Sequence, residues 1–451
     1  MGNLKAGFAK ININPPLGMG IDGYYVPRFG KGFLDDIEAS AIVVSLDDTK
    51  IAFLSIDNLG INYPDVLRYS QKIEEETGIP KENIYLSATH SHTAPLAAPT
   101  TFFEADNGPV YEYAKLLEEK LPQVVKMADE DLSFAKMGYM VGEAPKKVAY
   151  IRRYKMKDGS TMTCPPIDDP NIDHPIGELD NRVNVLRFKR EDKNDIVIVN
   201  YGLHADTVNG ELYSADWPGW MRRTLKVALD GVDAMFISGA QGDVGSTNVH
   251  PKDGDMNDTE ISFDNEMKSP EMARFVGRAI AGTVMQVFYK VKYVDVDEIK
   301  MLKKVVPVKA NIPTKEELVL AREYNRLHEE GKDHEIPYTA MELTTVVAEA
   351  IRMVQMENHP EYINLELAGA KIGPVAFLGI PGEPFTDIGV EIKDTEGFEL
   401  IMPSALTNGN EGYFPMESAY SEGGYEARTS PYKSGVAETI IKNAKELLGE
   451  L

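Results

Sequence analysis

Cysteine is almost absent from this sequence, which contains a single one, Cys164, in 451 residues. One cysteine excludes an intrachain disulfide and a zinc site built from several thiolates. Its neighbours Thr163, Pro165 and Pro166 supply no general base, so a passive thiol is favoured over a catalytic nucleophile. Any metal bound by this chain must therefore be held mainly by nitrogen and oxygen ligands.

Basic residues are scarce relative to acidic ones. Lys and Arg number 47 against 71 Asp and Glu, which gives a net charge of −24. This charge argues against nucleic acid as a partner, because phosphate binding needs clustered cations. It also argues against steady attachment to anionic membrane surfaces. The simplest role of the excess carboxylates is to keep the chain in solution.

Long apolar runs are also missing. No stretch reaches the ~18 apolar residues that indicate a membrane-spanning helix, so no transmembrane segment is predicted. The first residues, MGNLKAGFAK, lack the apolar core of a signal peptide. We therefore expect a cytoplasmic protein. The sequence leaves its oligomeric state open, and a homo-oligomer is one alternative.

Short apolar segments rich in Ile, Val and Phe recur along the chain. They are too short for buried helices and indicate buried β-strands. The expected strands are Ala41–Leu46, Ile51–Ile56, Ile84–Ser87, Ile196–Tyr201, Ala234–Ser238, Pro374–Leu378 and Glu399–Met402.

Segments with helical periodicity lie between these strands, and the alternation indicates an α/β fold. We expect a mixed β-sheet core with flanking helices and an active site at the carboxyl ends of the strands. Residues 1–451 are interpreted as one domain, in which residues 303–360 form a helical insertion or cover. The expected helices are Tyr63–Thr77, Val110–Met127, Trp220–Leu229, Glu271–Tyr289, Thr314–Glu330 and Tyr338–Met356.

Chemically active side chains follow several of the expected strands. Each one alone has a simpler explanation: a histidine such as His204 could be a hydrogen-bonded core residue, and Glu383 could cap a helix. The combination favours a metal site, since two histidines and one carboxylate are a common catalytic zinc set that leaves room for water. The residues concerned are Asp57, His90, His92, His204, Asp206, Asp243, Glu383 and Tyr413.

The same segments resemble the neutral/alkaline (non-lysosomal) ceramidase family, from about residue 5 to residue 445. The resemblance covers that family's N-terminal catalytic domain and not its C-terminal β-sandwich domain. It is carried by motifs in the family's order: AGFAKININPP (Ala6–Pro16), Ser55–Asp57, TGIPKENIYLSATHSH (Thr77–His92), Gly202–His204, Gly242–Val244, Pro381–Glu383, Asn408–Tyr413 and the Tyr425-Glu426 pair.

The resemblance implies roles for individual residues. A zinc ion would be bound by His90, His204, Glu383 and Tyr413. The residues implied around the scissile bond are His92, Arg152 and Tyr425, with His92 giving a proton to the leaving amine. Arg153 is adjacent to Arg152, and the sequence leaves open which of the two lines the site. Asp57, Asp206 and Asp243 are expected either to orient the ligand imidazoles or to cap loops.

The function implied is that of a ceramidase-like amidohydrolase in lipid metabolism, which cleaves the amide of a lipid-like N-acyl substrate with metal-activated water. The chain departs from the family pattern at Thr93–Pro95 and at Gly245–Asn248. Two alternatives stay open: a zinc esterase, lactonase or deacetylase for a small polar or sugar-derived substrate, and a non-catalytic metal-binding homologue. An apolar tunnel beside the metal would favour lipids, and a small polar pocket would favour sugars or small amides.

Overall fold

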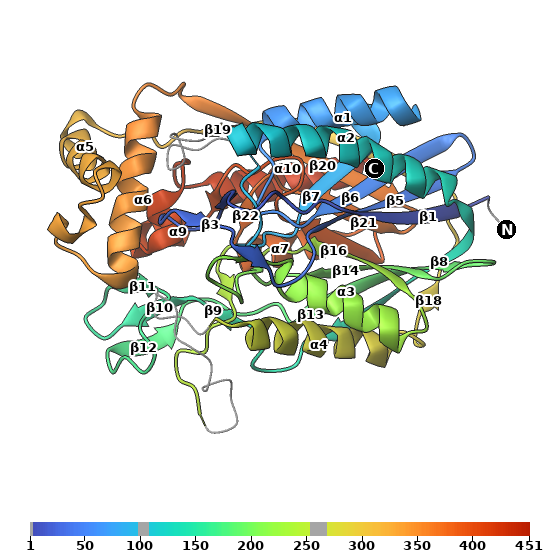
Figure 1. Ribbon diagram of the computed structural model, residues 1–451, viewed down its shortest axis with the longest axis horizontal. Helices are drawn as coiled ribbons and strands as arrows, with labels where there is room; N and C mark the ends of the chain where they lie inside the picture. Colours follow the sequence, from blue (N-terminus) through green and yellow to red (C-terminus); the bar gives the residue numbers. More distant parts are fainter. Residues whose placement is uncertain (1–2, 98–107, 253–267) are drawn as a thin grey trace.

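The structure is a computed structural model that describes residues 3–97, 108–252 and 268–451. Two β-sheets pack against each other, and helices cover their outer faces (Figure 1). The expected mixed-sheet α/β fold is therefore confirmed. None of the helices described is both long enough and apolar enough to cross a membrane.

The larger sheet is mixed, and its two halves are joined by only a short contact at the centre. Only two residue pairs, Lys5 with Phe134 and Ala6 with Ser133, join its middle strands β1 and β8. Along the sheet the strands are β16 (Asp233–Ser238), β14 (Ile196–Tyr201), β13 (Arg182–Arg190), β8 (Ser133–Glu143), β1 (Lys5–Asn12), β5 (Glu38–Leu46), β6 (Thr49–Ile56) and β7 (Ile84–Ala88), with β18 (Lys292–Tyr293) beside β8.

The smaller sheet has four strands and lies against the inner face of the larger one. Phe53 and Tyr85 of the large sheet meet Phe377 of the small sheet in a buried aromatic cluster, with ring centroids 4.8–6.0 Å apart. Its strand order is β19 (Ile299–Lys309), β20 (Tyr362–Ile372), β21 (Val375–Gly379) and β23 (Leu400–Ser404).

The central strands are buried on both faces. In β6, Ile51 and Phe53 pack toward the small sheet, while Leu54 and Ile56 pack toward helices. A strand covered on both sides reads as a continuous apolar run, which is why the sequence reveals this class of strand. All seven expected strands are present, with bounds shifted by a few residues.

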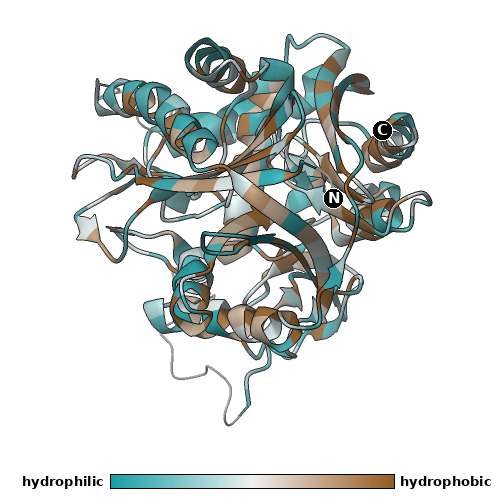
Figure 2. Cartoon of the chain, turned by 90° about the vertical axis from the view of Figure 1, so that its right-hand side faces the viewer, coloured by the Kyte–Doolittle hydropathy of each residue, from teal (hydrophilic) through white to brown (hydrophobic). Residues whose placement is uncertain are grey.

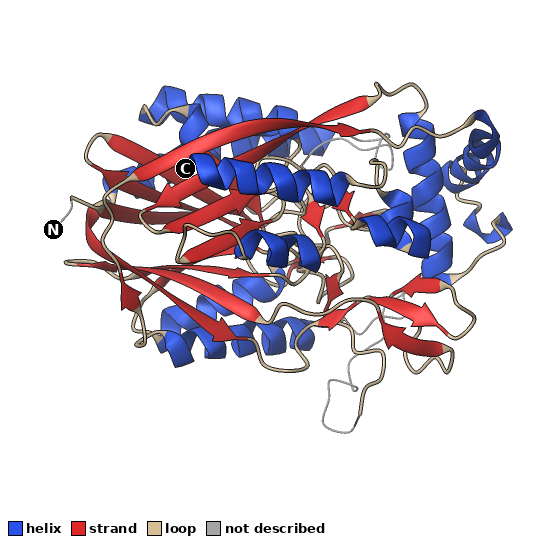
Figure 3. Cartoon of the chain, turned by 180° about the vertical axis from the view of Figure 1, so that it is seen from behind, coloured by secondary structure: helices blue, strands red, loops and turns tan. Residues whose placement is uncertain are grey.

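Helices complete the layers. α1 and α2 cover one half of the large sheet, α3 and α4 cover the other, and α7 and α10 cover the small sheet, as Figure 3 shows for the C-terminal helix. Peripheral helices carry both hydrophobic and hydrophilic residues in Figure 2, as expected for helices with one buried face. Their bounds are α1 Tyr63–Thr77, α2 Gly108–Glu130, α3 Asp216–Ala228, α4 Pro270–Val287, α5 Lys315–Glu329, α6 Ala340–Met356, α7 Thr386–Lys393, α8 Glu417–Glu422, α9 Tyr425–Thr429 and α10 Val436–Glu450.

Local sequence signals fix several helix ends. α1 ends at Gly78, whose φ of 73° suits a residue without a side chain and whose N–H bonds to Glu74 O. Ser269 caps α4 by accepting a hydrogen bond from Met272 N. Thr314 and Glu317 form a reciprocal capping box at the start of α5.

The predicted helical insertion is a helix pair between two strands. Residues 303–360 begin inside β19, so the pair itself is α5 and α6, joined through a short 3₁₀ turn (Asp333–Glu335). It has its own small core of Leu327, Ile336, Val346 and Val347. In Figure 1 both helices lie beyond one end of the sheets. The assignment of the whole chain to one domain stays a prediction.

Short strands build the region between the sheets and α6. They are β2 (Gly20–Ile21) with β3 (Arg28–Phe29), β4 (Gly32–Phe33) with β15 (Leu212–Tyr213), β9 (Tyr150–Ile151) with β17 (Val244–Gly245), β22 (Glu383–Pro384) with β24 (Tyr413–Phe414), and a three-stranded sheet of β11 (Thr161–Thr163), β10 (Arg153–Met156) and β12 (Ile172–Pro175).

Three parallel strand pairs, β6 with β7, β14 with β16, and β21 with β23, end close together. Two connections lock their carboxyl ends into one surface. In the first, Ala405 N donates to Ser238 O (2.9 Å). In the second, Asn408 bonds to both backbone groups of Leu86: Asn408 N donates to Leu86 O (2.8 Å), and Leu86 N donates to Asn408 Oδ1 (3.0 Å).

Replacing Asn408 with alanine should destabilise the fold by about 2–4 kcal/mol. The change leaves the buried Leu86 N–H without its acceptor and puts alanine at a φ of 57°. Denaturant unfolding measures the loss. The matched control, Asn364→Ala at an exposed position of β20, should stay within about 0.5 kcal/mol of the parent. Equal stabilities of the two variants would contradict this role of Asn408.

Candidate metal centre

A tight turn after β7 brings two histidines into the space beyond the strand ends. His90 has a φ of 67°, a left-handed conformation that histidine adopts more readily than most residues. Thr89 N bonds to Ile56 O and His92 N to Ala205 O, so the turn is tied to the ends of two other segments. The rings of His90 and His92 therefore point into the same region, with their centroids 4.8 Å apart.

His204, which follows β14, completes a group of three buried imidazoles. One ring nitrogen of each histidine lies within 4.8 Å of the others, so the group could hold a metal ion. Each Nδ1 faces a backbone carbonyl and donates to it, which leaves Nε2 with the lone pair. The acceptors are Leu59 O for His90 (2.8 Å), Gly23 O for His92 (3.1 Å), and Gln241 O (2.8 Å) and Val244 O (2.9 Å) for His204.

Glu383 supplies a carboxylate oxygen to the same point. Its Oε2 lies 3.1 Å from His90 Nε2 and 3.0 Å from His204 Nε2, yet this buried atom accepts no hydrogen bond from any described residue. Burial raises the pKa of Glu383, but positive charge on the two imidazoles outweighs burial and holds this pKa well below its usual range. With both rings neutral, a bound cation can supply that positive charge, and two imidazoles with one carboxylate are a common zinc donor set, so the residues present fit a bound metal.

Tyr413 and Arg152 lie beside Glu383 and His204. Tyr413 is the partner of Glu383 in the parallel pair β22–β24. Its hydroxyl accepts a hydrogen bond from Arg152 Nη2 (3.0 Å), and Arg152 Nη1 lies 3.2 Å from His204 Nε2. Glu426 Oε1 accepts from Arg152 Nε (2.7 Å) and Gly242 O from Nη2 (2.9 Å), which fix the guanidinium.

The adjacent arginine lies elsewhere. Arg153 Nη2 donates to Glu422 Oε2 (2.9 Å) and to Gly423 O (3.1 Å), away from the histidines. Alternation of side chains along an extended segment separates the two residues, so Arg152 is the one placed at the candidate site.

Tyr425 is brought to the same place by the start of α9. Its hydroxyl donates to Tyr25 OH (3.2 Å), and its ring lies 5.7 Å from that of Tyr413. The structure thus gathers all seven residues proposed from the sequence: His90, His92, Arg152, His204, Glu383, Tyr413 and Tyr425.

The carboxylates expected to orient the imidazoles have other partners. Asp57 forms a two-point ion pair with Arg222 (2.9 and 2.6 Å), and Asp243 accepts from the backbone and side chain of Thr386 (2.8 Å each). Only Asp206 approaches a histidine, 3.9 Å from His92 Nδ1. Backbone carbonyls orient the rings instead, and no side-chain motif marks such an acceptor in the sequence.

A small cavity of about 70 Å³ opens beside the histidines. It includes residues that the sequence did not single out, among them Tyr24, Tyr25 and Lys268. These three come from a connecting segment and from the start of the α4 region, where no motif marked them. The other side chains around it include His92, Arg152, Asp206, Met341, Tyr413 and Tyr425.

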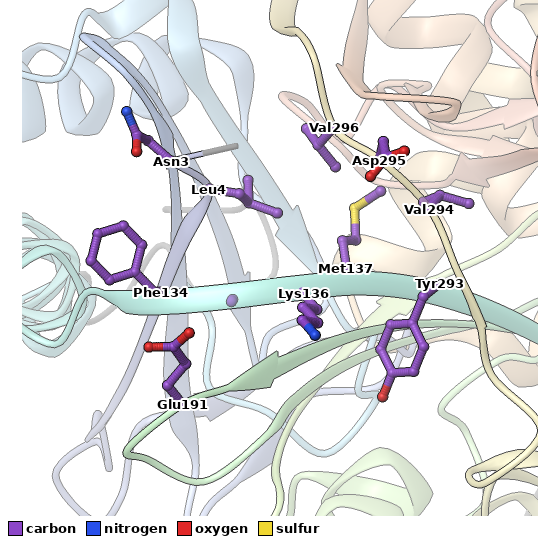
Figure 4. Close-up of a pocket in the computed structure, with 11 residues that line it drawn as sticks. Asn3, Leu4, Phe134, Lys136, Met137, Glu191, Tyr293, Val294, Asp295 and Val296 are labelled. Carbon is purple, nitrogen blue, oxygen red and sulfur yellow. The ribbon is translucent and has the colours of Figure 1, made fainter. Parts of the chain in front are cut away.

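A larger cavity of about 570 Å³ lies elsewhere (Figure 4). It is formed where the N-terminal segment, β8 and the segment around Tyr293 meet, and its lining includes Phe134, Lys136 and Glu191. None of the candidate metal or catalytic residues reaches it, so its size alone does not make it the functional site.

Comparison with known proteins gives structural matches only. No protein-family model matches the sequence, and no curated protein matches it. One solved structure, neutral ceramidase from Pseudomonas aeruginosa, is 16% identical with a TM-score of 0.71; all of this chain aligns with 75% of that one. Another, described as ceramidase complexed with C2, is 15% identical with a TM-score of 0.72; all of this chain aligns with 76% of it.

The chain has a neutral-ceramidase-like fold. Both alignments span the complete chain, which agrees with the extent of the resemblance found in the sequence. Because the identity is low, this likeness establishes the fold, and the chemistry has to be argued from the side chains.

Replacing Gly242 with alanine should weaken metal binding. A Cβ there would lie 2.6 Å from Glu383 O and 3.0 Å from Pro384 O, so the segment that carries the carboxylate must shift. Metal stoichiometry after dialysis and thermal unfolding measure the effect, which should include a loss of about 1–3 kcal/mol in the free energy of unfolding.

The control is Gly282→Ala in α4, where a Cβ meets nothing within 4 Å. That variant should have the same metal content as the parent and be as stable as the parent or slightly more so. Equal metal content in both variants would show that the close packing at Gly242 does not position Glu383.

Proposed function

We propose that this protein is a zinc-dependent hydrolase that cleaves the amide bond of an N-acyl substrate. The observation that carries the proposal is the buried Glu383 Oε2, 3.0–3.1 Å from two imidazole nitrogens without a hydrogen bond. The ceramidase-like fold adds support, because it is a hydrolase fold in the proteins with which it was compared.

The proposed zinc ligands are His90, His204, Glu383 and Tyr413. Imidazole nitrogens and a carboxylate oxygen are the ligands that catalytic zinc uses in proteins. When bound, zinc supplies Lewis acidity, which polarises a carbonyl group and acidifies water. His92 completes the three-histidine group, but Glu383 lies between His90 and His204, and this favours a separate role for His92.

Arg152 and Tyr425 are proposed to bind the substrate carbonyl. The ion pair with Glu426 and the bond to Gly242 O hold the guanidinium in place before substrate arrives, so its Nη1 donor needs little reorganisation. The Tyr425 hydroxyl adds a neutral donor, since burial and the neighbouring Tyr25 and Tyr413 raise its pKa well above the usual value.

His92 is proposed to transfer the proton. Burial, together with His90, His204 and Lys268, lowers the pKa of His92 well below its usual value, so the ring is neutral and its Nε2 can accept a proton from water. As the oxygen of that water bonds to the carbonyl carbon and the C–N bond breaks, His92 passes the proton to the departing nitrogen. The products are a carboxylic acid and an amine.

The size and lining of the cavity favour a second candidate function, which uses the same metal site on a different substrate. Its volume of about 70 Å³ is far below the ~300–1,000 Å³ of typical ligand pockets, and Lys268, Asp206 and several tyrosines line it. A zinc deacetylase, esterase or lactonase acting on a small polar substrate therefore fits the described residues better than an enzyme with a tunnel for a long acyl chain.

Glu383→Ala and His204→Ala should each lose zinc, with at least a 10-fold weaker affinity, and should lose amide hydrolysis. Each change removes one of the converging donors. Metal analysis of the purified variants tests this, with the exposed Glu76→Ala as the control that keeps full zinc content. Full occupancy in both site variants would show that the metal, if any, binds elsewhere.

His92→Ala should keep zinc but lower kcat by about 10²–10⁴-fold, the usual contribution of a positioned proton-transfer group. Zinc content and kcat are measured on the same preparation. Loss of the metal from this variant would instead make His92 a ligand of the three-histidine group.

Chelation should abolish hydrolysis and reduce thermal stability. A metal that binds only the folded chain adds about 2.7 kcal/mol when its free concentration is 100 times the dissociation constant. Protons compete for the same Nε2 lone pairs, so zinc should also be lost as the pH falls. Thermal unfolding with and without chelator, followed by zinc addition, measures both effects. Unchanged hydrolysis after complete metal removal would contradict the proposed mechanism.

A further inference from the structure

We propose that Asp206, Lys268 and Tyr24 form a subsite that binds a hydroxyl group of the substrate. The substrate would be a small, neutral, water-soluble N-acyl compound with a short acyl group and a hydroxyl near the amide. This inference rests on the proposed amide hydrolysis, and it identifies the part of the cavity that selects the substrate.

The three side chains form a closed and largely buried cluster. Lys268 Nζ donates to Asp206 Oδ2 and to Tyr24 OH, both at 2.6 Å, and Tyr24 OH donates to Asp206 Oδ1 at 2.6 Å. The side chains of Lys268 and Asp206 are 2% and 14% exposed. The Tyr24 ring makes cation–π contacts with Lys268 Nζ, 4.7 Å from its centroid, and with Arg28 Cζ, 4.0 Å from it, and these contacts stabilise its position.

The cluster lies next to the proposed metal centre. Asp206 follows the proposed ligand His204 by two residues, and its Oδ2 is 3.9 Å from His92 Nδ1. The Tyr24 and His92 rings are 5.7 Å apart. Both groups border the same cavity as Arg152 and Tyr425. A substrate whose carbonyl lies at the metal centre therefore places its nearest substituents against the cluster.

The charges of the cluster determine what it can bind. A carboxylate only accepts hydrogen bonds and can take up more than one per oxygen, so Asp206 calls for a donor on the substrate. A cationic donor would be repelled by Lys268 and Arg152, and an anionic group would have no proton to donate to Asp206. A hydroxyl is a neutral donor and meets both conditions.

An alkyl chain is a poor occupant of this position. It would take the ion pair of Asp206 and Lys268 further out of water without replacing any lost hydrogen bond. The cavity volume of about 70 Å³ also leaves room for few non-hydrogen atoms among the described residues. Charge and size therefore both select a short, hydroxylated substrate.

The test compares two amides that differ in one hydroxyl, N-acetylethanolamine and N-ethylacetamide, with the zinc-loaded full chain. The parent should prefer N-acetylethanolamine by about 10–100-fold in kcat/KM, because a site built around a hydroxyl rejects the analogue that lacks it. N-octanoylethanolamine should be cleaved at least ~10-fold less efficiently than the acetyl compound.

Substitutions in the cluster should reduce this selectivity. In Asp206→Asn the ratio of the two kcat/KM values should fall below about 3, and Tyr24→Phe, which removes only one hydroxyl, should give an intermediate ratio. The control Lys126→Met, at an exposed position of α2, should keep the parent ratio. Zinc content and thermal unfolding verify that each variant is folded. If Asp206→Asn does not fold, the ratio measured for Tyr24→Phe tests the proposal.

The outcomes separate the two proposals. Amide cleavage without preference for the hydroxylated compound, a preference for the octanoyl compound, or a parent-like ratio in the cluster variants would overturn the subsite while leaving the hydrolase intact. Release of amine from none of the three amides would contradict the proposed function, and the inference with it.

Discussion

The contact on which the site depends is the approach of one carboxylate oxygen to two imidazole nitrogens. Glu383 Oε2 lies 3.0–3.1 Å from His90 Nε2 and His204 Nε2, and backbone carbonyls hold the two rings so that their lone pairs face it. Such a group is electrostatically unfavourable unless a metal ion or a proton joins it. The strand ends that carry these residues are themselves linked by hydrogen bonds, for example through Asn408. These links hold the two imidazoles and the carboxylate close together.

Much of this arrangement could be predicted from the sequence because it depends on strands that are buried on both faces. β6, β14 and β21 have continuous apolar sequences, and the polar residues that follow them were recognisable as a group. The antiparallel strands β8, β19 and β20 were not expected, since polar and partly exposed residues interrupt their apolar sequences.

The details of the site were less predictable for a related reason. Hydrogen bonds from the histidines to backbone carbonyls leave no trace in side-chain identity, so Asp57 and Asp243 looked like better partners than Leu59 and Gln241. Lys268 and Tyr24 lie on connecting segments, and only the folded chain brings them 2.6 Å apart. The substrate, the location in the cell and the oligomeric state depend on properties that motifs of this kind do not encode.

The helix pair α5–α6 gives the protein a modular character. The strands on either side of the helix pair, β19 and β20, form a continuous antiparallel ladder of eleven residue pairs. It runs from Ile299–Ile372 to Lys309–Tyr362, the strand residues closest in sequence to the helices. The framework is thus complete without the helices, while Met341 and Thr344 of α6 border the cavity. Related chains could exchange this one connection for another and acquire a different wall around the same candidate metal centre, so the shape of the cavity can change without disturbing the residues that would hold the metal.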